Sequence, residues 1–227
     1  MGRTVTRRRR APASRRLFAH DRGLGVRVVA GIDEAGRGCL AGPLVVAGVA
    51  IDLAALTPRA RRALTMLDDS KRLSSDVRDA VADAIVRHLP AVVVASASPA
   101  TIDRDGLHVT NQRLMREIAF RLAPCADAVL VDGRPVPDPM PAHRTVVGGD
   151  GISAAIAAAS VIAKTTRDRL MRGPAATAHP AYGFPRHVGY ATGDHRVAID
   201  AHGPCRLHRM SYVTFARFCG EGGGAGE

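Results

Sequence analysis

One stretch of the sequence, residues 28–52, limits the possible folds more than any other. Its two apolar runs, one ending at Ile32 and one from Leu44 to Ile51, predict two buried strands. Directly after the first run come two adjacent carboxylates, Asp33 and Glu34. An unpaired buried charge is very unfavourable, so two acids at the end of a buried strand predict a cation beside them. A divalent metal ion is the simplest such cation.

The turn that follows these acids indicates an anionic ligand. Gly36 and Gly38 have no Cβ atoms to keep a ligand away from the backbone, and Arg37 between them carries a guanidinium suited to phosphate. A sugar-phosphate backbone would fit such a turn. Successive side chains of a strand point to opposite faces, so we expect Asp33 and Glu34 to share a site only if the strand ends between them.

Two further strands are predicted to end at an aspartate. The apolar residues 128–131 precede Asp132, and residues 145–147 precede Asp150 after two glycines. Each aspartate alone is an ordinary turn residue. Ligands of open α/β sheets collect where strands end, so acids at three strand ends predict one shared site.

The order of the predicted elements is typical of an α/β fold with a mixed central sheet. We expect an arginine-rich, disordered arm over residues 1–25, a catalytic domain over 26–218 whose C-terminal helical part begins near 174, and a flexible tail over 219–227. A loop is expected over 102–108. The remaining predicted elements are helices over 58–67, 75–89, from 110 or 111 to 122, 153–164 and 192–203, and a strand over 91–97.

The charge predicts a polyanionic partner. The formal net charge is +11, and residues 1–22 hold eight arginines against one acid, Asp21, or +7 of that total. A merely solvated arm is the alternative, and we expect its removal to weaken binding without ending catalysis. Only two lysines, Lys71 and Lys164, occur among 32 basic residues, which suggests positions that need a compact ammonium group.

Compartment signals are weak. No apolar run approaches the roughly 20 residues of a membrane span. The four cysteines form no C-x-x-C pair, which favours a reducing cytoplasm. The first residues also fit short patterns for myristoylation and for a mitochondrial transit peptide. The expected location is the cytoplasm.

Several motifs together resemble ribonuclease HII, in register from about Val28 to about Tyr212. Ribonuclease HIII is similar in its core but has a substantial N-terminal substrate-binding domain, whereas only some 25 residues precede the first strand here. The motifs are Gly31-Ile-Asp-Glu-Ala-Gly-Arg-Gly with Ala41-Gly-Pro, Asp69-Ser-Lys, Val131-Asp-Gly, Gly149-Asp, Ala157-Ala-Ala-Ser-Val-Ile-Ala-Lys, and Tyr182-Gly-Phe with His187-Val-Gly-Tyr and His195.

This resemblance implies a ribonuclease H fold and a metal-dependent endonuclease that acts as a monomer. It implies that two Mg²⁺ or Mn²⁺ ions bind to Asp33, Glu34, Asp132 and Asp150. The implied substrates are the RNA strand of RNA/DNA hybrids and single ribonucleotides in duplex DNA, as in ribonucleotide excision repair. The implied products carry 5′-phosphate and 3′-hydroxyl ends.

The resemblance also assigns substrate contacts. Gly36, Arg37 and Gly38 with Tyr190 would contact the 2′-hydroxyl, which is both a donor and an acceptor. Lys71 and Lys164 match the family as phosphate or structural contacts.

The sequence departs from the family at Val188, where a lysine is usual, so a phosphate contact is expected to be lost unless Arg186 or His187 replaces it. His195 is interpreted as a helix or core histidine. Two other hypotheses are a non-catalytic basic RNA-binding protein, which leaves the four acids unexplained, and a junction-resolving nuclease of the same fold, which needs no 2′-hydroxyl contact.

Overall fold

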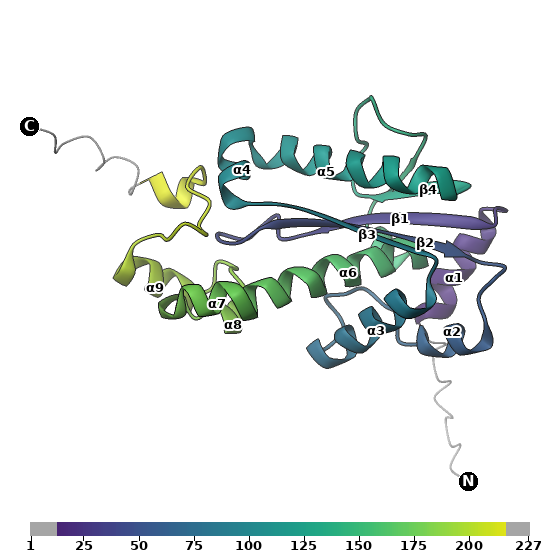
Figure 1. Cartoon of the computed structure of the whole chain (residues 1–227), viewed down its shortest axis with the longest axis horizontal. Coiled ribbons are helices and arrows are strands. Elements are labelled where there is room, and N and C mark those ends of the chain that lie inside the picture. Colours follow the sequence, from purple (N-terminus) through teal and green to yellow (C-terminus); the bar gives the residue numbers. More distant parts are fainter. Residues whose placement is uncertain (1–12, 217–227) are drawn as a thin grey trace, which may run out of the picture.

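The computed structural model describes residues 13–216. A five-stranded sheet in the order β3-β2-β1-β4-β5 forms its middle layer (Figure 1). β1 pairs antiparallel with β2 and parallel with β4, and β3 and β5 form the two edges, so the predicted mixed sheet is confirmed. The strands are β1 (Val28–Ala35), β2 (Leu44–Asp52), β3 (Ala91–Ala97), β4 (Ala128–Asp132) and β5 (Arg144–Val146).

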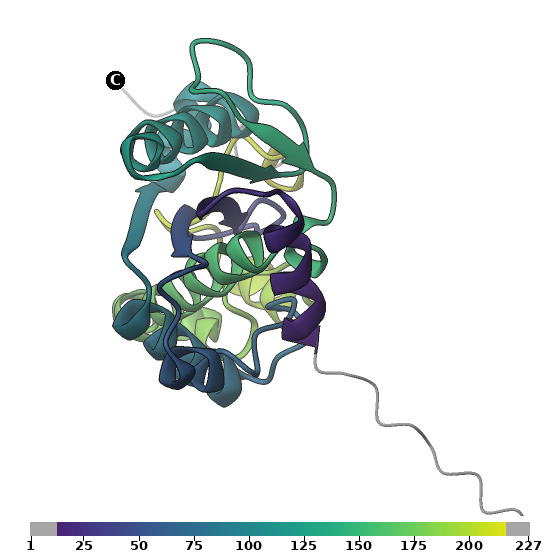
Figure 2. The same cartoon turned by 90° about the vertical axis from the view of Figure 1, so that its right-hand side faces the viewer.

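Two long helices cover the two faces of the sheet. α5 (Leu107–Leu122) lies on one face and α6 (Ala154–Leu170) on the other (Figures 1 and 2). Five of the first eight residues of α6 are alanine, and these short side chains are fully buried. Gly31 of β1 faces this helix, and a Cβ atom on Gly31 would overlap the backbone of Ala155. The small residues therefore bring α6 unusually close to the central strand.

Shorter helices surround this sandwich. Predicted caps are confirmed at Ser74 and Thr192, whose side chains accept hydrogen bonds from the first turns of α3 and α9. A third apolar cluster, centred on Phe184 and Phe215, holds the C-terminal helical part together. The other helical segments are α1 (Ala13–Gly23), α2 (Pro58–Ala63), α3 (Ser75–His88), α4 (Pro99–Asp105), η1 (Ala123–Cys125), η2 (Gly149–Gly151), η3 (Met171–Ala175), α7 (Ala176–Ala178), η4 (Pro180–Tyr182), α8 (Phe184–His187), α9 (Gly193–His202) and η5 (Val213–Phe215).

Two expectations about local structure are wrong. Residues 102–108 are not a loop: α4 begins at Pro99, capped by Ser98, and α5 already begins at Leu107. Gly106, with a φ of +81°, separates the two helices. The interruption is thus a single residue with a positive φ, a conformation that glycine adopts without strain.

Part of the expected disordered arm is helix α1. Leu17 and Phe18 of α1 pack into the main core, and the buried Asp21 accepts a hydrogen bond from the Ala155 backbone N–H at 2.9 Å. Asp21 therefore satisfies a free amide in the first turn of α6. Residues 1–12 of the expected arm and the tail 219–227 lie outside the described residues.

Candidate active site

A pocket of about 230 Å³ opens where β1 and β4 reach the same end of the sheet. It brings together residues from five distant parts of the sequence. All of the predicted site residues except Asp150 line it. The lining residues are Asp33, Glu34, Ala35, Gly36, Arg37, Gly38, Ser70, Lys71, Asp132, Ser160, Lys164 and Tyr190.

The two adjacent acids reach this pocket in a way that differs from the expectation. β1 does not end between Asp33 and Glu34, because both remain paired with β2 and the strand continues to Ala35. Pairing with β4, however, stops at Ile32. Beyond Ile32 the β4 side of β1 is open, so side chains from both faces of the strand reach the same space.

Asp33 lies on the α6 side of the sheet and is almost fully buried. Burial and then the neighbouring Glu34 raise the pKa of Asp33 well above its ordinary value, while a hydrogen bond with Ser160 opposes the shift. One carboxylate oxygen also accepts the Glu34 backbone N–H at 2.7 Å. Among the described residues, no lysine or arginine forms an ion pair with Asp33.

The other three acids have different partners. Burial raises the pKa of Glu34, and Arg37, whose Nη1 lies 3.3 Å from the Glu34 carboxylate, opposes the rise. Asp132 accepts the backbone N–H of Gly149 at 2.7 Å. Asp150 belongs to η2 and lies beside the pocket, where the Nζ atom of Lys71 is 3.4 Å from its carboxylate.

The chemistry of this donor set fits a hard divalent cation. Four carboxylates lie close enough to influence one another, and within residues 13–216 neither Asp33 nor Asp132 has a cationic partner. Oxygen ligands of this kind suit Mg²⁺ and Mn²⁺. In the arrangement described, no three His, Cys, Asp or Glu side chains of this part of the chain already form a metal-binding group.

The two glycines of the turn have different roles. Gly36 has a φ of +98°, and a Cβ atom there would overlap the side chain of Arg167. Packing within the protein therefore requires a glycine at position 36. A Cβ atom on Gly38 would have no other atom within 4 Å, so Gly38 leaves open space beside the pocket. The prediction that a ligand can closely approach the backbone therefore concerns Gly38.

Three further predicted contact residues, Lys71, Lys164 and Tyr190, line the same pocket. The Nζ atom of Lys164 lies 4.8 Å from the centre of the Tyr190 ring and donates to Asp168 at 2.8 Å. Lys71 is mostly exposed, apart from its contact with Asp150. Tyr190 is 38% exposed, so its ring is available to a ligand. These residues place positive charge and one aromatic face beside the acids.

The position of Val188 is explained by backbone packing. Its φ is +43°, its side chain is buried, and its carbonyl accepts a hydrogen bond from Arg167 at 2.8 Å. His187 is buried and bonded to Tyr182, so His187 cannot replace a surface phosphate contact. Arg186 is exposed, and its Nε atom lies 3.6 Å from a carboxylate oxygen of Asp194. Its side chain is therefore placed where it could contact a phosphate instead.

Asn111 lies at the site but was not among the site residues predicted from the sequence. It lies in the second turn of α5, is 5% exposed, and its amide hydrogen-bonds with the Glu34 side chain. It lines a second groove of about 580 Å³ that shares Glu34 and Asp132 with the first pocket. The sequence held one signal for this residue: Asn111 is polar but stands at a position where the helical spacing of α5 places apolar residues.

Two buried arginines that hold the site together were also missed. Arg167 donates to the carbonyls of Ala41, Pro43 and Val188 at 2.8–3.0 Å. Arg209 donates to the carbonyls of Arg37 and Gly42 at 3.0–3.2 Å. Apart from the Tyr212 hydroxyl, which accepts from Arg209 at 2.7 Å, their acceptors are backbone carbonyls, so no local motif indicates them.

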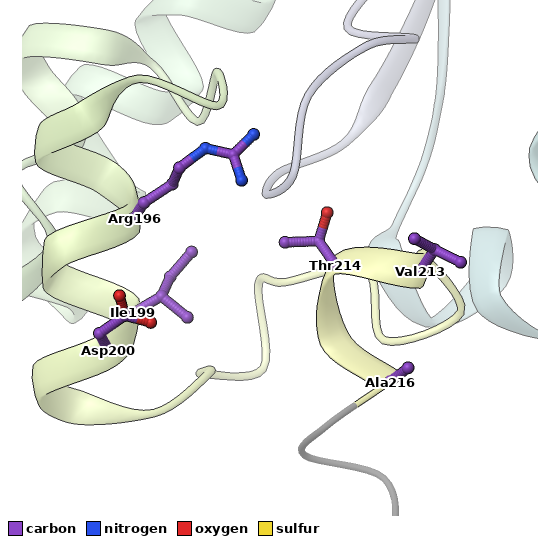
Figure 3. Close-up of a pocket in the computed structure, with 6 residues that line it drawn as sticks. All are labelled: Arg196, Ile199, Asp200, Val213, Thr214 and Ala216. Carbon is purple, nitrogen blue, oxygen red and sulfur yellow. The ribbon is translucent and has the colours of Figure 1, made fainter.

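A further hollow of about 460 Å³ lies between α9 and η5 (Figure 3). Arg196 and Ile199 of α9 lie on one side of it and Thr214 on the other. None of the predicted site residues lines this hollow. It is therefore separate from the acidic pocket.

Comparison with known proteins links this geometry to one family. The family model described as Ribonuclease HII matches residues 30–215. The chain is 46% identical over 188 residues to Ribonuclease HII of Rhizobium meliloti (strain 1021), covering 82% of this chain and 83% of that protein. The structure of the PCNA:RNase HII complex from Archaeoglobus fulgidus matches with a TM-score of 0.66 and 28% identity, covering 82% of this chain and 95% of that one. Bst-RNase HIII in complex with Mn²⁺ matches in fold alone, with a TM-score of 0.61 and 19% identity over 86% of this chain and 70% of that one.

Proposed function

This chain belongs to the ribonuclease HII family of metal-dependent endonucleases, and on that basis we propose what it cuts and how. Its substrates are the RNA strand of RNA/DNA hybrids and single ribonucleotides within duplex DNA. Cleavage on the 5′ side of the ribonucleotide leaves 5′-phosphate and 3′-hydroxyl ends. The carrying observation is that acids, a glycine-rich turn and an exposed tyrosine line one pocket.

Asp33, Glu34, Asp132 and Asp150 would hold two divalent cations, Mg²⁺ or Mn²⁺. Two observations support this assignment. All four side chains offer oxygen donors, and within the described residues neither Asp33 nor Asp132 forms an ion pair. When bound, such cations supply activation of the attacking water and stabilisation of the 3′-oxygen leaving group. Ser160 keeps the Asp33 carboxylate oriented through its hydrogen bond.

The remaining pocket residues recognise the substrate. The open space over Gly38 lets the ribose approach the backbone of the turn, where an N–H or a carbonyl can bond to the 2′-hydroxyl. Tyr190, which lines the same pocket, contacts the same sugar. Arg37, Lys71 and Lys164 provide positive charge for the phosphates on both sides of the scissile bond.

The protein is proposed to act as a monomer in the cytoplasm. In residues 13–216, no helix is both long and apolar enough to cross a membrane.

The deciding experiment uses a DNA duplex that contains one ribonucleotide, beside an all-DNA duplex of the same sequence. Each is incubated with the protein in Mg²⁺, in Mn²⁺ and in chelator. We expect metal-dependent incision on the 5′ side of the ribonucleotide and an intact control. Binding without incision under all conditions would favour a non-catalytic RNA-binding protein. Incision of the control would indicate a nuclease that does not recognise the sugar.

A further inference from the structure

Three buried histidines in the C-terminal part have no role in the function described above. His187, His195 and His208 are 6%, 0% and 1% exposed. The rings of His187 and His195 stack with their centres 4.3 Å apart, and the Nε2 atoms of His195 and His208 are 3.1 Å apart. Buried polar atoms need partners, so the partners of these rings show what the rings hold in place.

The hydrogen bonds of His195 and His208 allow one arrangement of protons. The Nδ1 atom of His195 lies 2.8 Å from the Tyr190 carbonyl oxygen and must donate to it. The Nε2 atom of a neutral His195 must then accept, so His208 donates from its own Nε2 atom. The Nδ1 atom of His208 is left to accept the Cys205 backbone N–H at 2.8 Å. The result is a directed chain of hydrogen bonds from Cys205 through two imidazoles to Tyr190.

The segment that carries His208 also holds the glycine-rich turn. His208 forms an isolated β-bridge with Ala41, and the Arg209 backbone N–H donates to the Leu40 carbonyl at 2.9 Å. The guanidinium of Arg209 donates to the Arg37 carbonyl at 3.0 Å. The hydroxyl of Tyr212 donates to the same carbonyl at 3.0 Å.

Residues 205–212 therefore contact both the Gly36–Gly38 turn, through Arg209 and Tyr212, and Tyr190, through His208 and His195. The two segments also meet directly, where the Leu40 backbone N–H donates to the Gly189 carbonyl at 2.9 Å. We propose that His195 and His208 are positioning residues that fix Tyr190 relative to this turn and so set how strictly the site requires a 2′-hydroxyl. This inference rests on the proposed function, because it concerns the same sugar contact. It assigns a task to two buried side chains that touch neither the acids nor the pocket.

Two substitutions of His195 separate positioning from simple packing. In His195→Asn, the amide nitrogen takes the place of Nδ1 and still donates to the Tyr190 carbonyl. In His195→Gln, the amide takes the place of Nε2, so the contact with His208 remains and the donor to Tyr190 is lost. Both remove the ring that stacks on His187. A merely structural role would affect both variants equally.

The measurements are kcat and KM for incision at a single ribonucleotide, and Kd for the all-DNA duplex. We expect His195→Gln to lose about tenfold in kcat/KM, the loss of roughly one hydrogen bond, while His195→Asn, which keeps the donor to Tyr190 and loses only the contact with His208, loses about threefold. Both variants should keep the wild-type Kd for all-DNA duplex. Equal losses in the two variants, or no loss in either, would overturn the positioning role.

A second pair covers the case in which either His195 variant fails to fold. His208→Gln keeps a donor toward His195, and His208→Met removes it at similar volume. We expect only His208→Met to lower kcat/KM at the ribonucleotide, and equal behaviour would again overturn the inference. The wild type is assayed first: if it does not distinguish the two duplexes, the proposed function itself fails, whereas discrimination that is insensitive to these variants removes only the positioning role.

Discussion

The backbone of Gly31 in β1 lies directly against the backbone of Ala155 in α6, leaving no room for a Cβ atom on Gly31. This contact sets the distance between the central strand and the helix behind it. Two residues further along β1 is Asp33, which bonds to Ser160 on the same helix. The close approach at Gly31 thus places the first acid of the site.

Gly31→Ala is expected to destabilise the protein severely. The new methyl group would meet backbone atoms, which cannot move aside as a side chain can, so the loss should be at least about 3 kcal/mol in the free energy of unfolding. Urea unfolding followed by circular dichroism measures it. Gly23→Ala is the matched control, because a Cβ atom there would have no other atom within 4 Å. A Gly31→Ala variant as stable as this control would contradict the observed packing.

Asp33→Asn is expected to abolish cleavage while leaving the fold and substrate binding intact. It should also raise the free energy of unfolding in chelator, by on the order of 1 kcal/mol, because a buried carboxylate with a strongly raised pKa is replaced by a neutral amide. Activity assays, Kd measurements and thermal melts together test it. Glu117→Gln, on the exposed side of α5, serves as the control. Retained cleavage would remove Asp33 from the catalytic site.

Stability should fall as the pH is lowered from about 6.5 to about 4. Burial lowers the pKa of both His195 and His208 to about 4, whereas an unfolded histidine titrates near its ordinary value of 6.5. In this window the unfolded chain binds more protons, so the free energy of unfolding decreases, by up to about 3 kcal/mol for each imidazole. Coulombic repulsion from neighbouring groups adds to this effect: His187 and Arg196 act on His195, and His195, His179 and His187 act on His208.

Chemical unfolding at a series of pH values tests this dependence. His208→Gln should flatten the curve between pH 4 and 6.5, because one titrating group is gone. His88→Gln, on α3 away from the cluster, should leave it unchanged. A wild-type curve that is flat over this range would mean that the two imidazoles are accessible to protons in the folded state.

Deleting residues 1–12 is expected to weaken duplex binding and reduce its salt dependence while leaving incision intact. The deletion removes five arginines, Arg3, Arg7, Arg8, Arg9 and Arg10. Each lost phosphate contact lowers the slope of log K against log salt by about 0.9. An unchanged slope would show that these arginines do not contact the nucleic acid.

A longer deletion, through Gly23, should by contrast destabilise the fold. It removes the buried Leu17 and Phe18 and the acceptor that Asp21 gives to the Ala155 N–H. The expectation that the whole arginine-rich arm is dispensable for catalysis is therefore restricted to residues 1–12.

The sequence indicated the sheet, its mixed order and the acids because these features are local. An apolar run that ends at an acid, a serine before a helix and an alanine-rich stretch can be recognised within a few residues. Helix α4 was missed because Gly106 looked like part of a loop, whereas it only separates two helices. Helix α1 was missed because its many arginines concealed Leu17 and Phe18.

The sequence by itself determined which residues are proposed to carry the chemistry, since the acids, the glycine-rich turn and Tyr190 all lie in recognisable motifs. Only the tertiary structure decided how they are held together. Most partners of Arg167 and Arg209 are backbone carbonyls more than a hundred residues away; the exceptions are the Val188 carbonyl and the Tyr212 hydroxyl. A backbone carbonyl has no residue type that a sequence could reveal, so such contacts become visible only when the folded chain brings them together.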